Sequence, residues 1–290
     1  MDKQANFKQL FVFVLIPLIP LVIFWIIPLI ISVWLSLTNW DYISPTYEYV
    51  GLDNYLNLIN NDAFLDALNN TLLFTVATVI PTIVLGFVFA VMLNQLRKTK
   101  GFLQGLMFAP WITPMVGMSI VWSWMFNPSV GPINQVLGLF GLPEPNWLSD
   151  SSTAIWAVII VTVWKGVGWA MLFFSDALTK IPKGLFEAAD VEGAGLGQRI
   201  RMILIPLVSP MTLFLFIILT LDALQAYDQI SILTQGGPSG STRTLLYLYY
   251  EMTFQQFNIG AGTAVTVLIL IISAFLAFLS MILSKKFVFY

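Results

Sequence analysis

The chain has 290 residues, of which 58% are hydrophobic and 10% charged, and it contains neither His nor Cys. Soluble domains carry about a quarter charged residues because water must wet their surface, so this composition places the chain in a membrane. Without imidazole or thiol groups, the sequence excludes disulfides and the usual zinc, haem and iron–sulfur sites. The net charge of −2 argues against a nucleic-acid partner, since phosphate binding needs a basic face.

Long intervals without charged residues divide the chain into candidate membrane helices. A helix crosses a bilayer with about 20 apolar residues. We therefore predict an all-α polytopic protein, with residues 1–290 forming one transmembrane domain. Its six expected spans are residues 10–36, 70–96, 102–127, 153–176, 206–234 and 260–284. The first is too long for the apolar part of a signal peptide and lacks an Ala-x-Ala-like cleavage site, so we interpret it as a retained span.

The cationic residues predict which side of the membrane each end of the chain faces. Cytoplasmic loops are enriched in Lys and Arg. With six spans and the N-terminus inside, 11 of the 13 cations fall on the cytoplasmic side. We therefore expect both termini in the cytoplasm. The inner cations are Lys3, Lys8, Arg97, Lys98, Lys100, Lys180, Lys183, Arg199, Arg201, Lys285 and Lys286.

Two long outer segments carry apolar residues as well as acids. Residues 37–69 contain an apolar pattern with helical spacing, which predicts a short interfacial helix. Residues 127–152 combine turn-forming Pro and Gly with the apolar stretch 133–140, which indicates a partly ordered cap. The helical pattern in the first segment consists of Tyr55, Leu58, Phe64 and Leu68.

The inner connection 177–205 is much longer than a simple turn and mixes acids with cations. Pro182 can begin a short helix, because its missing N–H is not needed in a first turn. Three glycines after this helix allow a sharp turn. We predict an ordered amphipathic helix that projects into the cytoplasm. Its apolar face comprises Leu185, Phe186 and Ala189, and the glycines are Gly193, Gly195 and Gly197.

This inner connection resembles the EAA loop of ABC importer permeases. The matching residues are Glu187, Ala188, Ala189, Glu192, Gly193, Ala194 and Pro206. Glu192 stands where the family more often has Asp, which keeps the charge. The segments VGLDNYLNLI, INQVLGLFGLPEPNWLSD and VWKGVGWAMLFF are also similar to the carbohydrate-type permeases, which include maltose and glycerol-3-phosphate permeases. The resemblance runs from about Ile16 to the C-terminus.

The resemblance implies a permease subunit that imports a sugar, oligosaccharide or polyol by ATP-driven alternating access. It implies four kinds of partner in the bacterial plasma (inner) membrane: a second homologous permease subunit, two ATPase subunits, an extracellular or periplasmic substrate-binding protein, and lipid. ATP and Mg²⁺ would be bound by the ATPase subunits, since this chain lacks a Gly-x4-Gly-Lys-Ser/Thr phosphate loop. We therefore expect no catalytic residue, cofactor site or metal site in the chain, and the EAA helix would dock onto an ATPase.

The resemblance also places substrate-binding candidates in the third, fourth and fifth spans. Trp faces can stack on sugar rings, while Lys, Asp, Thr and Gln supply donors and acceptors. The tryptophans could instead serve packing. Lys165 and Asp222 could form an intramembrane ion pair, which is compatible with a pocket role, and Asp228 is interpreted as a gate or subunit contact. The candidates are Trp111, Met115, Thr162, Lys165, Gly166, Trp169, Asp222, Ala223, Gln225 and Ala226.

Three other functions compete with sugar import. A glycerol-3-phosphate-type permease could use Lys165 for the anion, although two acids lie in the same region. An ion-coupled secondary transporter often has ten or more spans and internal repeats, and neither is found here. An intramembrane enzyme would need paired acids at catalytic spacing, whereas Asp222 and Asp228 are six residues apart and would point to different faces of one helix.

Overall fold

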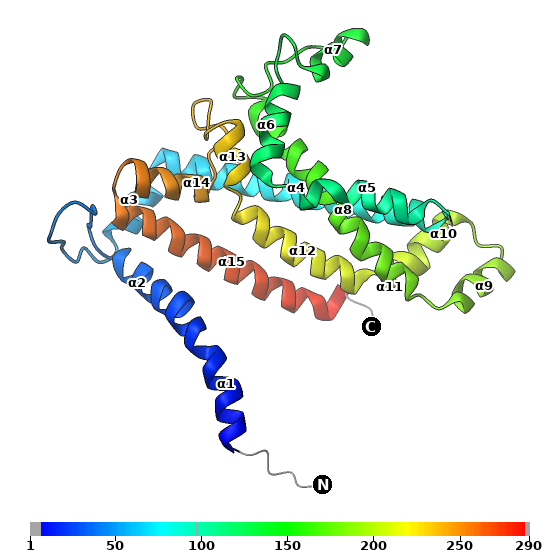
Figure 1. Ribbon diagram of the computed structural model, residues 1–290, viewed down its shortest axis with the longest axis horizontal. Coiled ribbons are helices and arrows are strands. Elements are labelled where there is room, and N and C mark those ends of the chain that lie inside the picture. The colour runs from blue at the N-terminus through cyan, green and yellow to red at the C-terminus, as the bar shows by residue number, and fades with distance from the viewer. Residues whose placement is uncertain (1–6, 97, 288–290) are drawn as a thin grey trace. The chain divides into compact units, whose positions relative to one another are not determined.

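The computed structural model describes residues 7–96 and 98–287, which form helices joined by turns (Figure 1). Within these residues there is no β-strand, and a single antiparallel bridge joins Thr38 to Tyr49. The predicted all-α fold is therefore confirmed. Two of the expected inner cations, Lys3 and Arg97, lie outside the described residues.

Four helical segments of the described chain are long and apolar enough to cross a membrane. Two further spans result if each of two bent helix pairs counts as one crossing, which gives six. The direction in which the chain enters the membrane stays a prediction. The four segments are Val12–Leu35, Asp62–Asn94, Ala154–Thr179 and Ile259–Ile282.

The predicted third span, residues 102–127, is a bent pair rather than a straight helix. Helix α5 (Lys100–Ile112) meets α6 (Met115–Met125) at 97°. Thr113 and Pro114 between them have extended backbones, with ψ of 133° and 135°. Proline disfavours the helical region for the residue before it and has no N–H of its own, so the helix stops at this point.

A second bend lies near the start of the predicted fifth span, residues 206–234. The lead-in consists of α10 (Leu196–Arg199), the π-helical turn η2 (Ile200–Leu204) and α11 (Ile205–Leu207). This lead-in and α12 (Ser209–Leu224) form an angle of 64°, with the break at Val208. Pro206 and Pro210 flank the break and remove two backbone donors, which accounts for its position.

The fifth span also ends earlier than predicted. Residues 206–234 were expected as one helix, but α12 stops at Leu224 and a separate helix, α13, covers Asp228–Leu233. The Thr244 hydroxyl donates a 3.1 Å hydrogen bond to the Ala226 carbonyl between the two helices. That acceptor is satisfied from a distant loop, so the backbone can leave the helix without an unpaired buried carbonyl.

The contacts divide the chain into two compact units, which are described separately. Unit 1 comprises Met1–Asn61 with Leu248–Leu270, and unit 2 comprises Asp62–Tyr247 with Ile271–Tyr290. Helix α15 (Ile259–Phe287) begins in the first unit and ends in the second, and α14 (Leu245–Tyr250) also crosses the division.

Unit 1 is held together by polar contacts at the loop after its first span. The Asn54 side chain donates 2.8 Å hydrogen bonds to the carbonyls of Ser36 and Thr38. Asn54 lies on α3 (Asp53–Ile59), so the short helix predicted in residues 37–69 exists, although Phe64 and Leu68 belong to the next long helix. Its location at the membrane interface stays a prediction. The other elements of this unit are α1 (Phe7–Leu21), the π-helical turn η1 (Val22–Ile26), α2 (Ile27–Leu35), α3 (Asp53–Ile59) and the π-helical turn η3 (Glu251–Gln255).

The core of unit 2 is a pair of long helices, α4 (Asp62–Asn94) and α8 (Ala154–Thr179), which pack along each other (Figure 1). Helix α5 packs on α8, and α12 packs on α4. Small residues allow the close approach. A Cβ atom added to Gly86 would lie 2.7 Å from that of Ala170, and one added to Gly168 would overlap the Met107 carbonyl. Interfaces of this kind are typical of helices packed in a membrane.

The loop of unit 2 that is predicted to face outward is ordered and is built on α7 (Pro132–Leu139). The Trp147 indole donates a 2.8 Å hydrogen bond to the Asn134 side chain, which in turn donates to the Pro145 carbonyl. Further along the loop, the backbone amide and hydroxyl of Ser152 donate to Asp150 and hold the pKa of that carboxyl below its usual value. These contacts order the connection that leads into α8.

Candidate functional site

A polar cavity of about 200 Å³ lies within unit 2, among α4, α8, α12, α13 and the bend between α5 and α6. Most of the predicted binding residues meet there, although they come from three different spans. The seven that line the cavity are Trp111, Met115, Thr162, Lys165, Gly166, Asp222 and Ala223. Trp111 precedes the bend at Pro114 and Met115 follows it, and both line the cavity.

The other three predicted residues do not line the cavity. Trp169 stacks on Trp111 with ring centroids 5.0 Å apart, so it supports a wall residue from outside. Gln225 is exposed, and Ala226 is buried with its carbonyl bonded to Thr244. The break after α12 explains both positions, because it turns these residues off the helix that carries Asp222.

Further lining residues were missed in the sequence. Helix α4 contributes a face that includes Thr78 and Thr82. Together with Thr71 and Thr75, they are spaced by four, three and four residues in a charge-free stretch, which places all four hydroxyls on one helical face. That periodicity was a usable signal. Asp228, which the sequence suggested as a gate or subunit contact, also lines the cavity. The lining residues that were not named from the sequence are Thr78, Val79, Thr82, Leu219 and Gln229.

Lys165 is held by the backbone of the bend. Its ammonium group donates a 2.5 Å hydrogen bond to the Thr113 carbonyl at the end of α5. Among the described residues it forms no ion pair with Asp222, although both line the same cavity. The alternative in which these two residues form a direct ion pair is therefore not what this structure contains.

The predicted inner helix is present as α9 (Lys183–Val191), which begins directly after Pro182. Gly193 ends it with a φ of +71°, a conformation that disfavours residues with a Cβ. The Ala194 amide then donates to the Ala189 carbonyl over 2.9 Å. Gly195 is extended and precedes α10, whereas Gly197 lies inside α10, so the expected turn is formed by the first two of the three glycines.

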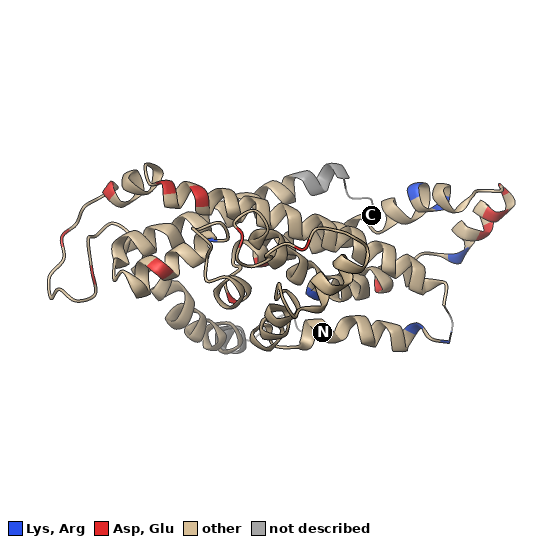
Figure 2. Cartoon of the chain, turned by 90° about the horizontal axis from the view of Figure 1, so that it is seen from above, with Lys and Arg blue, Asp and Glu red and all other residues tan. Residues whose placement is uncertain are grey.

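The residues of the EAA-like segment divide into an inward and an outward set. Ala189 is buried and Ala194 and Pro206 are half-buried, so these residues hold the segment against the chain. The outward set is Glu187, Ala188, Glu192 and Gly193, all exposed. Charged residues of both signs gather at the end of unit 2 that carries α9 and α10 (Figure 2). An exposed ridge with a fixed backbone can serve as a docking surface.

Arg199 ties α9 to α10. Its guanidinium group forms a 2.5 Å ion pair with Asp190, and its Nε donates a 2.8 Å hydrogen bond to the Ala194 carbonyl. The Gln198 side chain accepts from the Gly195 amide and caps the start of α10. The sequence did not predict this clasp, because its two charged ends are nine residues apart across a turn. Such a pairing cannot be found from helical spacing alone.

A cavity lined by polar residues among helices apolar enough to span a membrane, with a charged ridge at one end of unit 2, is the arrangement of a membrane transport subunit. The family model described as binding-protein-dependent transport system inner membrane component matches residues 82–288. The match extends over more than half of the chain, and the chain belongs to this family. The resemblance to ABC importer permeases that the sequence indicated is thus confirmed.

Several relatives match over nearly their full length. The chain is 32% identical over 269 residues to the trehalose/maltose transport system permease protein of Thermococcus litoralis, covering 91% of this chain and 90% of that protein. It is 32% identical over 275 residues to the multiple sugar-binding transport system permease protein of Streptococcus mutans, covering 95% and 94%. It is 31% identical over 263 residues to the sn-glycerol-3-phosphate transport system permease protein of Pectobacterium atrosepticum, covering 90% and 89%.

The fold is shared with a solved transporter. A chain in the crystal structure of a bacterial ABC transporter involved in the import of the acidic polysaccharide alginate superposes with a TM-score of 0.83. The superposition covers 96% of both chains at 21% sequence identity. This match supports the helical architecture of an ABC importer permease.

Proposed function

We propose that this chain imports a sugar, oligosaccharide or polyol as one of two permease subunits in an ABC importer. The observation that carries the proposal is the cavity of unit 2, in which Trp, Thr and Asp side chains meet among apolar spans. Polar groups at membrane depth are costly unless they face a cavity or partner. Two of the relatives named above are permeases of sugar systems.

The proposed assembly follows from what the chain contains and lacks. A second homologous permease subunit would complete the pathway, and a binding protein would deliver substrate from outside the cell. Two ATPase subunits would bind ATP and Mg²⁺, since the phosphate loop is missing from this sequence. In the bacterial plasma membrane, with both termini inside, α9 would meet an ATPase through Glu187, Ala188 and Glu192, supported by Ala189, Gly193, Ala194 and Pro206.

Two other functions compete with this proposal, one with a different substrate and one with a different energy source. The relative from Pectobacterium atrosepticum is named for sn-glycerol-3-phosphate, and a secondary transporter would use an ion gradient. Uptake should be measured in proteoliposomes that contain the complex purified from its native host, with the ligand of the copurified binding protein identified by mass spectrometry. We expect uptake to require internal ATP. Uptake that follows an ion gradient and ignores ATPase loss would refute the importer proposal.

The proposed docking role of α9 can be tested by charge reversal. Glu187→Lys places a cation on the exposed ridge, and Gly193→Leu forces a β-carbon into a backbone with φ of +71°. Both should reduce transport-coupled ATP hydrolysis at least tenfold, or release the ATPase, while the chain still inserts. Lys98→Glu, a charge reversal on the exposed α4–α5 turn, is the matched control. Normal coupled hydrolysis in both α9 variants would contradict the docking role.

A further inference from the structure

The loop between α13 and α14, residues 234–244, is folded on itself by polar contacts. The hydroxyls of Thr234 and Thr242 lie 2.7 Å apart, and Thr242 also donates a 2.9 Å hydrogen bond to the Gly237 carbonyl. Gly240 has a φ of +79°, a conformation that favours glycine. The loop is therefore an ordered element, and it can hold a side chain in a fixed place.

The beginning of α4 holds this loop on both sides of Thr244. The Asn70 side chain donates a 3.1 Å hydrogen bond to the Arg243 carbonyl. The next residue of α4, Thr71, accepts a 2.8 Å hydrogen bond from the Leu245 amide through its hydroxyl. Two neighbouring side chains of one helix thus fix the residues immediately before and after Thr244, although they are more than 170 residues away in the sequence.

Thr244 in turn bonds to the break between α12 and α13. Its hydroxyl donates a 3.1 Å hydrogen bond to the Ala226 carbonyl and accepts a 3.3 Å hydrogen bond from the Tyr247 amide in the first turn of α14. Thr244 and Ala226 are both buried. Water therefore has little access to the Ala226 carbonyl, and the Thr244 hydroxyl supplies the donor that it needs outside a helix.

The break determines where the first residues of α13 lie. Asp228 and Gln229 follow Ala226 by two and three residues, and both line the cavity. A buried carbonyl that loses its donor is unfavourable, so the neighbouring backbone would rearrange to find another. The amide four residues further on, that of Ile230, would supply it if the helix continued. Such a rearrangement would turn Asp228 and Gln229 relative to the cavity.

We infer that Thr244, together with Asn70 and Thr71, positions the α13 side of the cavity. None of the three is among the residues that line the cavity, so each acts through the backbone that it holds. Helix α4 then contributes twice: Thr78 and Thr82 line the cavity directly, and the beginning of the helix places α13 through the loop. The consequence for transport rests on the proposed function, whereas the position of α13 does not.

The absence of Cys from the chain allows the position of α13 to be measured directly. Gln229→Cys places a thiol at the beginning of α13, and Thr162→Cys places one on α8 in the same cavity; both positions are half-buried. The rate at which N-ethylmaleimide labels this chain in the assembled transporter, without ATP, is followed by mass spectrometry. Thr244→Val removes the hydroxyl and keeps the side-chain volume. It should raise the rate at Gln229→Cys at least threefold, because the wall is no longer held, and change that at Thr162→Cys less than twofold.

Three further variants in the Gln229→Cys background separate the hydrogen bond from a general loosening of the fold. Thr244→Ser keeps the hydroxyl and should stay within twofold of the parent rate. Thr71→Val removes one of the two contacts between α4 and the loop and should raise the rate at least twofold. Combined with Thr244→Val it should add little, because both act on one link. Thr212→Val is the matched control: its hydroxyl donates over the same 3.1 Å, but to the Val208 carbonyl at the other end of α12, and its loss should change the rate less than twofold.

The outcomes distinguish a failure of this inference from a failure of the proposed function. A rise of less than threefold in Thr244→Val, or an equal rise at Thr162→Cys, would overturn the inference. If Thr244→Val does not assemble, equal rates in Thr71→Val and Thr212→Val would overturn it. In proteoliposomes, ATP-driven uptake of trehalose by the chain without an added thiol should fall several-fold in Thr244→Val and recover in Thr244→Ser. The expected labelling together with unchanged uptake would support the positioning role and count against the cavity as the transport site.

Discussion

The segment Val12–Leu35 and helix α8 are both apolar spans, yet their surroundings differ completely. The first has the higher mean hydropathy, 2.9 against 1.9, but 0% of its most apolar window is buried, compared with 56% for α8. Hydrophobicity therefore identifies a span without predicting whether the span is packed in the chain. In a bilayer, lipid covers apolar side chains as well as another helix does, so burial needs a different cause.

Small residues provide that cause. Helix α8 contains Gly166, Gly168 and Ala170 on faces that contact α4 and α5. The first span has no Gly or Ala between residues 7 and 35, and its proline and β-branched residues keep neighbouring backbones apart. Its side chains are left to lipid or another subunit. The difference between the two helices is thus one of shape rather than of hydrophobicity.

The largest effect is expected from a substitution at Gly168, where α8 and α5 approach each other closely. Gly168→Leu puts a side chain into the space of the Met107 carbonyl, which belongs to backbone and cannot rotate away. We expect a destabilisation of more than about 4 kcal/mol and loss of the monodisperse peak in size-exclusion chromatography. Val33→Phe on the exposed face of α2 adds comparable bulk and should keep the peak. Equal behaviour of the two variants would show that packing does not distinguish the helices.

The second prediction compares the same truncation, Phe to Ala, at a buried position and at an exposed one. Phe174 on α8 is 1% exposed and lies edge-on to Phe87, whereas Phe24 in the first span is 73% exposed. Phe174→Ala should lower the free energy of unfolding by about 3 kcal/mol. Phe24→Ala should change it by less than about 0.5 kcal/mol. Thermal unfolding of both variants in one detergent checks this, and a larger loss from Phe24→Ala would reverse the comparison.

The sequence predicted the helical class and the position of most spans, because long uncharged runs are a direct signal. It did not predict the two bends. Pro114 and Pro206 were visible, but proline occurs in several spans, and Pro81 lies inside the continuous helix α4. Whether a proline bends a helix depends on which neighbours satisfy the freed backbone groups. Lys165 does so for the Thr113 carbonyl, from 52 residues further along the chain.

Seven of the ten predicted binding residues line the cavity, and a physical reason separates them from the others. Residues on regular helices near the bend, such as Thr162 and Asp222, were placed correctly because their helices continue as expected. Gln225 and Ala226 were misplaced because α12 ends just before them. The threonines of α4 carry neither a charge nor an aromatic ring and so give a weaker signal, although their spacing places them on one helical face as clearly as that of an apolar stripe.

The third prediction concerns a region held by polar contacts rather than by close packing. Arg199→Gln removes the ion pair with Asp190 and weakens the link to the Ala194 carbonyl. The Arg199 side chain is 29% exposed and that of Asp190 62%, so solvent screens part of the pair. Because Arg199 also donates to the Ala194 carbonyl, we expect a loss of about 1 kcal/mol in the stability of the α9–α10 arrangement. Molecules transported per ATP hydrolysed should fall several-fold while assembly is retained.

Exchange of the two charges supplies the control for this clasp. The double variant Asp190→Arg with Arg199→Asp keeps one positive and one negative side chain at these two positions. It should recover part of the number of molecules transported per ATP hydrolysed. An unchanged ratio in Arg199→Gln would mean that α9 is positioned by the glycine turn and buried Ala189 alone. Recovery in the exchanged pair would separate the role of the pair from general damage to the fold.

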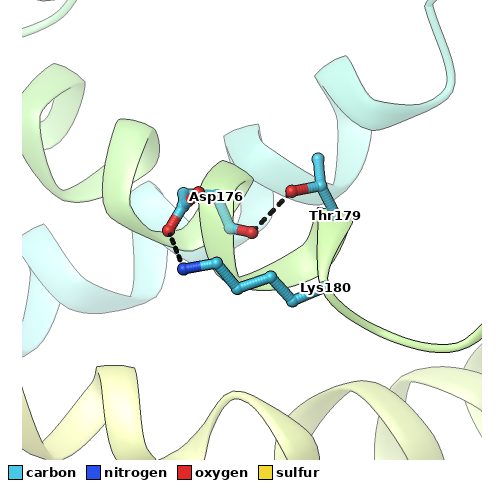
Figure 3. A network of polar contacts seen from close by, with 3 residues as sticks. All are labelled: Asp176, Thr179 and Lys180. Carbon is cyan, nitrogen blue, oxygen red and sulfur yellow. Dashed lines mark hydrogen bonds and ion pairs between the residues drawn. The ribbon is translucent and has the colours of Figure 1, made fainter.

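The smallest effect is expected where an ion pair of nearly the same length is more than half exposed at both ends and has no backbone hydrogen bond from its cation. Lys180 and Asp176 approach to 2.6 Å at the end of α8, beside a Thr179 hydroxyl that donates to the Asp176 carbonyl (Figure 3). The two side chains are 69% and 57% exposed, so solvent screens the pair. Asp176→Asn should cost no more than about 0.5 kcal/mol in thermal unfolding and leave the transport ratio unchanged. If it costs as much as Arg199→Gln, then neither the lower exposure of Arg199 nor its hydrogen bond to the Ala194 carbonyl adds to stability, and the contrast between packed and exposed regions would not extend to polar contacts.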